Sequence, residues 1–153
     1  MLTQQGCGFQ LRSAPAWPLS LQPVATESVP QGRDFVQQLR ATFREYGVQL
    51  DGPSMSRVLV QNEHYKRSVQ SLDLEGRVSE YRLDYQVSIG LNDEAGQPLI
   101  TVENYHYQRS YAYDPTRALG HQWQLQEMIE RMRQQAVEEF MQRVALSDWM
   151  GGK

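Results

Sequence analysis

The segment from Tyr81 to Leu91, YRLDYQVSIGL, constrains the fold more than any other part of the sequence. Apolar or aromatic residues occupy every second position, and mostly polar residues stand between them. Because successive side chains of a β-strand point to opposite faces, this alternation predicts a strand with one buried and one solvated face. The expected inward set is Tyr81, Leu83, Tyr85, Val87, Ile89 and Leu91. A sheet with one apolar face needs a second layer to cover it.

Strand-like segments lie on both sides of this one. Residues 57–74 are long for one straight strand, so we expect a bulge or bend near Lys66 and Arg67. Residues 92–98, NDEAGQP, have the composition of a hairpin loop, and Leu99 to Tyr111 is predicted to return as the next strand. Three consecutive strands joined by short turns predict an antiparallel meander.

A short helix is predicted from Asp34 to Tyr46. Its apolar residues recur at the spacing of one helical face: Phe35, Leu39 and Phe43. Asp34 is a residue type that caps helix amino ends, and Gly47 is the type that ends helices. This helix therefore has one apolar stripe to bury.

A longer helix is predicted to open at Asp114-Pro115 and to run to about Leu146. Its apolar stripe comprises Leu125, Met128, Ile129, Met132, Ala136, Phe140 and Val144. The opposite, polar face is expected to carry Glu127, Glu130, Arg133, Glu138 and Gln142. Both helices can hide their stripes on the apolar face of the sheet.

The element order predicts a single α+β domain over residues 17–146. We expect a two-layer sandwich, in which two helices cover one face of an about four-stranded, mostly antiparallel mixed sheet. The first strand, Trp17 to Thr26, would join in parallel through the crossover helix, and Pro18 and Pro23 favour an edge position or an interruption of the strand. Residues 1–16 are expected to form a flexible tether and residues 147–153 a frayed tail.

Composition narrows the classes of partner. The 153 residues have a net charge of −3, which gives no general reason to expect nucleic acid. No apolar run approaches the roughly 20 residues that span a bilayer. The chain has one cysteine, Cys7, between Gly6 and Gly8, which excludes an internal disulfide. From the residues alone, Cys7 is an inert thiol, a reactive thiol, an intermolecular disulfide partner or a modified residue.

Signatures of catalysis are missing from the sequence. It has no GxSxG, HExxH or Walker-type motif, and its three histidines lie on different predicted elements. The adjacent carboxylates Glu138 and Glu139 fall on the polar side of the last helix, where solvated charge is the ordinary role. We therefore expect no enzyme activity, no metal site and no cofactor.

Aromatic residues and an arginine share one face of the last predicted strand: Tyr105, Tyr107, Arg109, Tyr111 and Tyr113. Such a face can stack bases, as in sheet-based RNA binders. The acidic net charge favours the alternative, in which these tyrosines pack under the last helix and contribute to a protein interface.

Basic residues gather in two groups. One contains Lys66 and Arg67 with Arg77 and Arg82 nearby, and the other is Arg117 beside His121. If the fold brings the two groups to one end of the sheet, they would favour an anionic ligand through charge-assisted hydrogen bonds.

Several short motifs, in this order along the chain, resemble the LPS-assembly lipoprotein family, LptE, also called rare lipoprotein B. The amino end CGFQLR, residues 7–12, is similar to the family's mature start, and REYGV, residues 44–48, to its first helix end. The stretch from Gly76 to Tyr81 matches a glycine turn before a strand. YDPTRAL, residues 113–119, and the long helix after it resemble the family's last helix.

This resemblance implies a function. Members are lipoproteins on the periplasmic side of the Gram-negative outer membrane. They plug a large β-barrel translocon, LptD, and assist and bind lipopolysaccharide during its insertion into the outer leaflet. Here Cys7 would carry the lipid anchor, and several acyl chains give stable membrane attachment because each buried CH₂ contributes about 0.8 kcal/mol.

The same resemblance indicates which residues to expect at the two contact surfaces. Lipopolysaccharide contacts in the family are basic residues near the strand turn and near the start of the last helix, here Lys66, Arg67, Arg77, Arg117 and His121. The barrel would meet Tyr105, Tyr107, Arg109 and Tyr111. The alternative function is a periplasmic α+β binding module for a peptide or protein ligand.

Overall fold

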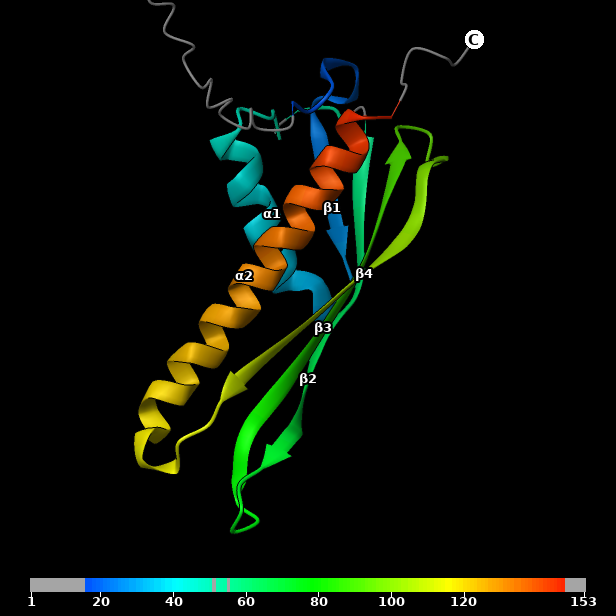
Figure 1. Ribbon diagram of the computed structural model, residues 1–153. Coiled ribbons are helices and arrows are strands. Elements are labelled where there is room, and N and C mark those ends of the chain that lie inside the picture. The colour runs from blue at the N-terminus through cyan, green and yellow to red at the C-terminus, as the bar shows by residue number, and fades with distance from the viewer. Residues whose placement is uncertain (1–15, 51, 55, 148–153) are drawn as a thin grey trace, which may run out of the picture.

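The computed structural model describes residues 16–147, apart from residues 51 and 55. One four-stranded sheet has the order β1-β2-β3-β4 (Figure 1). β1 (Val24–Ser28) pairs in parallel with β2 (Ser56–Leu72), whereas β2, β3 (Val78–Asp93) and β4 (Pro98–Ala112) form an antiparallel meander. The predicted mixed sheet, with its parallel first strand, is confirmed. Cys7 lies outside the described residues, as do the predicted tether and tail except for residues 16 and 147.

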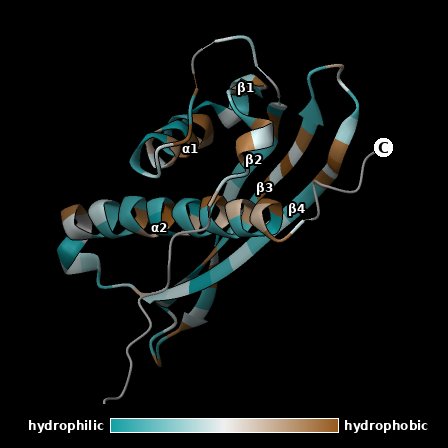
Figure 2. Cartoon of the chain, turned by 90° about the horizontal axis from the view of Figure 1, so that it is seen from above, coloured by the Kyte–Doolittle hydropathy of each residue, from teal (hydrophilic) through white to brown (hydrophobic). Residues whose placement is uncertain are grey.

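Two helices, α1 (Arg33–Glu45) and α2 (Ala118–Ala145), lie on the same face of the sheet, as the view from above shows (Figure 2). The alternation predicted for the central strand is confirmed there: Leu83, Tyr85, Val87, Ile89 and Leu91 are all 0% exposed beneath the helices. The α1 stripe Phe35, Leu39 and Phe43 is likewise fully buried. The two-layer α+β sandwich therefore forms as the periodicities predict.

The amino end of α1 differs from the prediction. The N-cap residue is Gly32 and not Asp34, and no side chain at this position caps the helix. Instead the carboxylate of Glu63, from β2, accepts the backbone N–H of Phe35 (3.0 Å). At the other end Gly47 has φ +71°, and Val48 N–H bonds back to the Phe43 carbonyl (2.8 Å), as in a Schellman cap.

The first strand is shorter than predicted and starts later. Leu19–Leu21 form a 3₁₀ turn, and β1 begins only at Val24. Pro18 and Pro23 lack the N–H groups that a ladder needs, which accounts for the late start. Trp17 nevertheless enters the core, where its ring meets Phe43 edge-on with centroids 4.8 Å apart.

The main irregularity of β2 lies before the predicted position. Pairing with β3 shifts between Gln61 and His64, and smaller shifts follow between Val69 and Leu72. Lys66 and Arg67, where the bend was expected, are in regular register. Asn62 has φ +52°, a conformation that asparagine tolerates better than most residues, so the bulge forms there.

The last helix begins with a 3₁₀ turn, Pro115–Arg117, before α2 proper. Asp114 does cap this turn, because its carboxylate accepts the Thr116 backbone N–H (2.9 Å). The stripe from Ile129 to Val144 is buried as predicted. The first turns of α2 instead run past the core, and Leu119 and Trp123 are 80% and 79% exposed.

Candidate functional site

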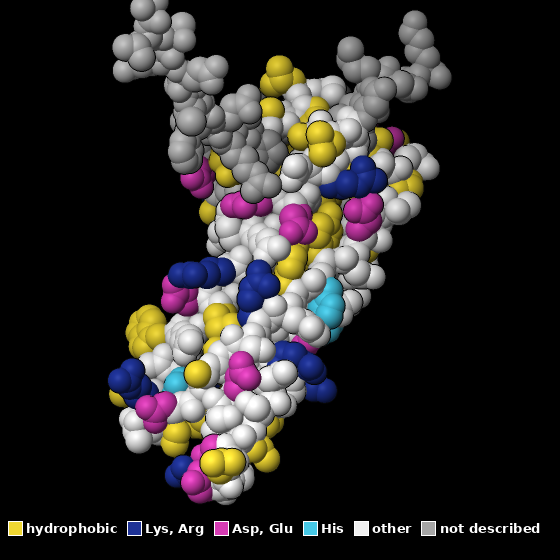
Figure 3. Space-filling view, in the orientation of Figure 1, with side chains coloured by type: hydrophobic (Ala, Val, Ile, Leu, Met, Phe, Trp, Pro, Cys, Tyr) yellow, Lys and Arg dark blue, Asp and Glu magenta, His cyan; other side chains and the backbone are white. Residues whose placement is uncertain are grey.

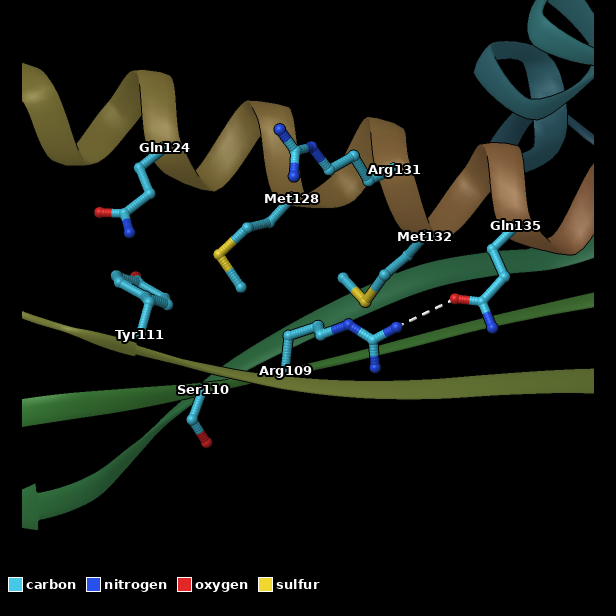
Figure 4. A pocket seen from close by; sticks show the side chains of 8 residues that line it. All are labelled: Arg109, Ser110, Tyr111, Gln124, Met128, Arg131, Met132 and Gln135. Atoms are coloured by element: carbon cyan, nitrogen blue, oxygen red, sulfur yellow. Dashed lines mark hydrogen bonds between the residues drawn. The ribbon is translucent and has the colours of Figure 1, made fainter. Parts of the chain in front are cut away.

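A hollow opens between the first half of α2 and the end of β4, and we call it the α2–β4 hollow. Its volume is about 430 Å³, and Figure 4 shows the side chains that line it: Arg109, Ser110, Tyr111, Gln124, Met128, Arg131, Met132 and Gln135. Met128 and Met132 reach from α2 toward the strand, and the Tyr111 ring rises from β4 to meet them. Flexible thioethers and an aromatic ring make a surface that adapts to apolar chains.

Arg109 gives the hollow its positive charge. Its guanidinium donates to the side chain of Gln135 (3.0 Å) and to the backbone carbonyl of Gln108 (3.0 Å). Both acceptors are neutral, and Arg109 has no carboxylate partner in the part of the chain that the structure describes. Arg131, by contrast, pairs with Glu127 (2.6 Å). Arg109 is therefore the hollow's cation available for charge-assisted bonds to an anion.

An aromatic cluster continues the hollow toward the β2–β3 turn, and it consists of Tyr81, Tyr111, Tyr113 and His121. The Tyr81 ring lies 5.8 Å from Tyr111 and 5.0 Å from Tyr113, and Tyr113 lies 4.7 Å from His121, between centroids. Arg67 sits over the Tyr81 ring at 4.5 Å, a cation–π distance. Tyr111 belongs to both the cluster and the hollow, so the two form one continuous surface.

The nearby Tyr111 hydroxyl is the first cause of the raised pKa of the Arg67 guanidinium, although burial acts against the shift. That hydroxyl is buried and has no hydrogen-bond partner of good geometry among the described residues. Arg67 therefore stays charged at all physiological pH values.

The five predicted lipopolysaccharide-binding residues do not all meet. Arg67 and His121 border the aromatic cluster. Lys66 lies on the opposite face of the sheet, because it pairs in register with Asp84 whereas Arg67 pairs with the buried Leu83.

The remaining two cations of that set already have partners. Arg77 donates to Asp73 (2.8 Å) and also pairs with Glu75 (3.4 Å) within its own turn. Arg117 lies 3.9 Å from the Asp114 carboxylate. Both are well exposed, so these surface pairs contribute little to stability, but local carboxylates offset their charge.

The predicted barrel-facing residues divide between core and surface. Tyr107 and Tyr111 are buried under α2, so the packing alternative accounts for these two rings. Burial raises the pKa of the Tyr107 phenol, which donates to Glu139 (2.8 Å) and so fastens β4 to α2. Tyr105 is half-buried and Arg109 exposed. Contact with a barrel stays a prediction, and only the latter two offer much surface for it.

A buried carboxylate clamp, Glu63 with Tyr85 and Arg133, was missed by the sequence analysis. Glu63 accepts from the Tyr85 hydroxyl (3.0 Å) and from Arg133 Nε (2.7 Å), and its second oxygen holds Phe35 of α1. Glu63 and Arg133 are each 9% exposed, so the expectation that Arg133 faces solvent is wrong. Burial raises the pKa of Tyr85. Burial alone would lower the pKa of Arg133, but the hydrogen bond and charge of Glu63 outweigh it, so the pKa of Arg133 is raised.

Within the described residues, no three His, Cys, Asp or Glu side chains gather as a metal site. None of the helices in this part of the chain has the length and apolar character needed to traverse a bilayer.

The open mixed sheet and the two helices on one face define a small two-layer α+β protein, and its hollow combines a cation with apolar side chains. The sequence matches the profile of the lipopolysaccharide-assembly family LptE over residues 18–144, so the chain belongs to this family. No curated protein matches it.

Solved structures with the same fold include proteins from the following three bacteria. Rare lipoprotein B from Shewanella oneidensis superposes with a TM-score of 0.65 at 22% identity, covering 80% of this chain and 92% of that one. Lipoprotein B from Nitrosomonas europaea gives 0.71 at 20% identity, with 90% of each chain covered. A minor lipoprotein from Acinetobacter baumannii gives 0.67 at 18% identity, covering 84% and 93%. At these identities the likeness establishes the fold.

Proposed function

We propose that this protein is an outer-membrane lipoprotein, anchored on the periplasmic side through Cys7, that binds lipopolysaccharide and plugs its β-barrel translocon, LptD. Membership of the lipopolysaccharide-assembly family supports the general role. The lipoprotein names of the structural neighbours support the anchor. Cys7 lies outside the described residues, so the anchor rests on the sequence and on these relatives.

The observation that carries lipopolysaccharide binding is the pairing of a free cation with an apolar floor. Lipopolysaccharide joins phosphates to acyl chains, and the α2–β4 hollow offers Arg109 beside Met128 and Met132. Arg67 and Arg109 both pair with Leu83 in register, from opposite sides, so they flank it on the helix-covered face roughly 10 Å apart. Neither guanidinium has a carboxylate partner among the described residues, so each can hold a phosphate.

Exposed hydrophobic side chains surround this end of the molecule beside basic ones (Figure 3). Leu74 at the β2–β3 turn is fully exposed, and Leu119 and Trp123 project from α2. Leu19 and Leu146, at the other end of the described chain, are also exposed (85% and 78%), so the hollow and its cations are what distinguish this end as a binding surface. In the proposed role Leu74, Leu119 and Trp123 contact acyl chains or the barrel wall.

The decisive measurement is lipopolysaccharide binding by the full chain and by Arg109→Glu. We expect the variant to bind roughly ten-fold more weakly, because a charge-assisted bond becomes a repulsion. Arg33→Glu, which reverses an exposed charge on α1, is the control and should bind as the parent does. Equal affinity of the parent and both variants would remove the hollow as the binding site.

Anchoring and plugging need their own measurements. Intact mass of the protein extracted from membranes should show cleavage before Cys7 and added acyl chains, and Cys7→Ser should abolish both. Co-purification with a large outer-membrane barrel tests the plug. A fully soluble periplasmic protein without such a barrel would contradict this part of the proposal.

A further inference from the structure

The outer edge of β2 is covered over only part of its length. β1 pairs with Ser56 to Val60 and no further, and Val29 N–H then bonds to the Val60 carbonyl (3.3 Å) before the chain turns away into α1. Residues 64–72 pair with β3 on one side. On their other side, no strand of the described chain follows β2 (Figure 1). We call residues 64–72 the free β2 edge.

An edge of this kind is a template for another strand, because its outward N–H and C=O groups have no ladder partner. Nine residues of strand span roughly 30 Å, enough for a stable added strand. Three large side chains along it are half exposed: Tyr65 53%, Val69 52% and Leu72 57%. An added strand would cover these side chains as well as bond to the backbone.

Charge on the free β2 edge has one sign. The sequence HYKRSVQSL contains Lys66 and Arg67 and no acidic residue. Neither cation has a carboxylate within 4.0 Å in the described part of the chain. Asp84, opposite Lys66 in register, is already bonded to Arg82 and Gln108. The edge therefore offers uncompensated positive charge to whatever pairs with it.

We propose that the free β2 edge binds an extended, acidic segment of a protein partner by strand addition. Backbone ladder bonds would supply affinity, and carboxylates on the partner would meet Lys66 on one face and Arg67 on the other. A second copy of this chain fits less well, because its own β2 edge would bring two more cations and no carboxylate.

The opposite edge of the sheet, the outer side of β4, is the internal control. Its amino end is Pro98, which cannot donate to a ladder. It also carries Glu103, which pairs with Arg143. These features disfavour strand addition of an acidic segment there.

The test uses the full chain and a labelled nine-residue peptide in which adjacent pairs of glutamates alternate with adjacent pairs of valines, so that carboxylates point to both faces of the added strand. Fluorescence anisotropy gives its affinity, and amide hydrogen exchange locates it. We expect binding that weakens with salt and new protection within residues 64–72 but not within 98–112. Lys66→Glu combined with Arg67→Glu should weaken binding about ten-fold, and a lysine–valine peptide should then bind that variant instead.

Two controls separate strand addition from simple charge attraction. A peptide of the same charge with D-valine in place of L-valine cannot form a regular L-strand and should bind far more weakly. Lys66→Glu alone should leave lipopolysaccharide binding unchanged, since Lys66 faces away from the α2–β4 hollow. Absent binding, equal binding of the D-valine peptide, or protection on β4 would each overturn the proposal.

Discussion

The two ends of this molecule are built from the same strands and the same helix, yet one is packed and the other open. In the packed half, α1, β1 and the last turns of α2 bury Phe35, Phe43 and Phe140 completely. In the open half, the β2–β3 turn and the first turns of α2 leave Leu74, Leu119 and Trp123 almost fully exposed. Figure 1 shows both ends of the described chain at the packed half.

This contrast separates what folds the protein from what is available for binding. β3 and α2 each begin in the open half and end in the packed half, so the core holds them at one end and lets the other project. The hollow and the aromatic cluster lie in the open half, close to the point where β3 and α2 leave the core and α1 no longer packs beside them. Binding residues therefore sit on regular elements rather than on long loops, which positions them well.

The largest effect should separate the two halves by stability. Phe140→Ala removes a fully buried ring from the packed half and should lower the free energy of unfolding by about 3–5 kcal/mol. Trp123→Ala removes a larger ring that is 79% exposed and should change it by less than about 0.5 kcal/mol. Urea unfolding measures both, and similar losses would show that the open half is not open in solution.

The next largest effect concerns the buried clamp, in which Glu63 of β2 connects α1, β3 and α2. Glu63→Ala removes the nearer carboxylate of the buried Arg133, leaves it only Asp34 at 3.8 Å, and should cost about 3 kcal/mol. Glu63→Gln combined with Arg133→Met replaces the pair by neutral groups and should recover most of that loss. Thermal unfolding of the three proteins tests this, and a double variant no more stable than Glu63→Ala would argue against the pair as the cause.

Ligand binding should follow the open half alone. Arg67→Glu with Arg109→Glu should weaken lipopolysaccharide binding by ten-fold or more, because each loses a charge-assisted contact. The matched pair Arg77→Glu with Arg117→Glu should have a smaller effect, since Asp73, Glu75 and Asp114 already offset those charges. Lipopolysaccharide affinities of the two double variants, measured at one salt concentration, test this. A larger loss for the Arg77 and Arg117 variant would place the binding site at the β2–β3 turn and the start of α2 instead.

The smallest effect should be seen at the β2–β3 turn. The backbone N–H of Arg77 is the first cause of the lowered pKa of Asp73, with the Arg77 side chain adding to it. Because this pKa is lowered in the folded state, the Asp73 carboxylate stabilises the fold at pH values above the ordinary aspartate pKa of about 3.9. This stabilisation is lost as the pH falls below that value. The stability advantage over Asp73→Asn should thus be present at pH 7 and fade toward pH 2. Chemical unfolding across that range measures it, and an advantage independent of pH would contradict the assignment.

Much of the fold could be predicted because its signals are periodic. The alternation through Leu83 to Leu91 and the stripe through Ile129 to Val144 each depend on one regular repeat, and both are buried as expected. The start of β1 was misplaced because Trp17 to Pro23 reads as apolar and extended, while its prolines prevent pairing.

The site was harder to predict, because its residues come together only where α2 and β4 separate, and the sequence does not show where that happens. Tyr111 and Arg109 were chosen from strand parity, but nothing in the sequence shows that Met128 and Met132 leave a hollow above them. Glu63 looked like one polar residue among several, and only the bulge turns it into the helix layer. Buried charges of this kind have no periodic signature, so the clamp could not be found from sequence.

The bulge at Asn62 inserts one extra residue into β2, so it exchanges the two faces of the strand for all residues that follow, down to the next register shift. Before it, the even-numbered Val58 and Val60 pair with buried residues of β3; after it, the odd-numbered Tyr65 and Arg67 do. One extra residue thus decides which of two adjacent cations joins the aromatic cluster and which faces away. Deleting Asn62 would remove this extra residue and move every side chain down to the next shift to the other face of the sheet. Lys66 would then face the helices, and Arg67 would face away from them.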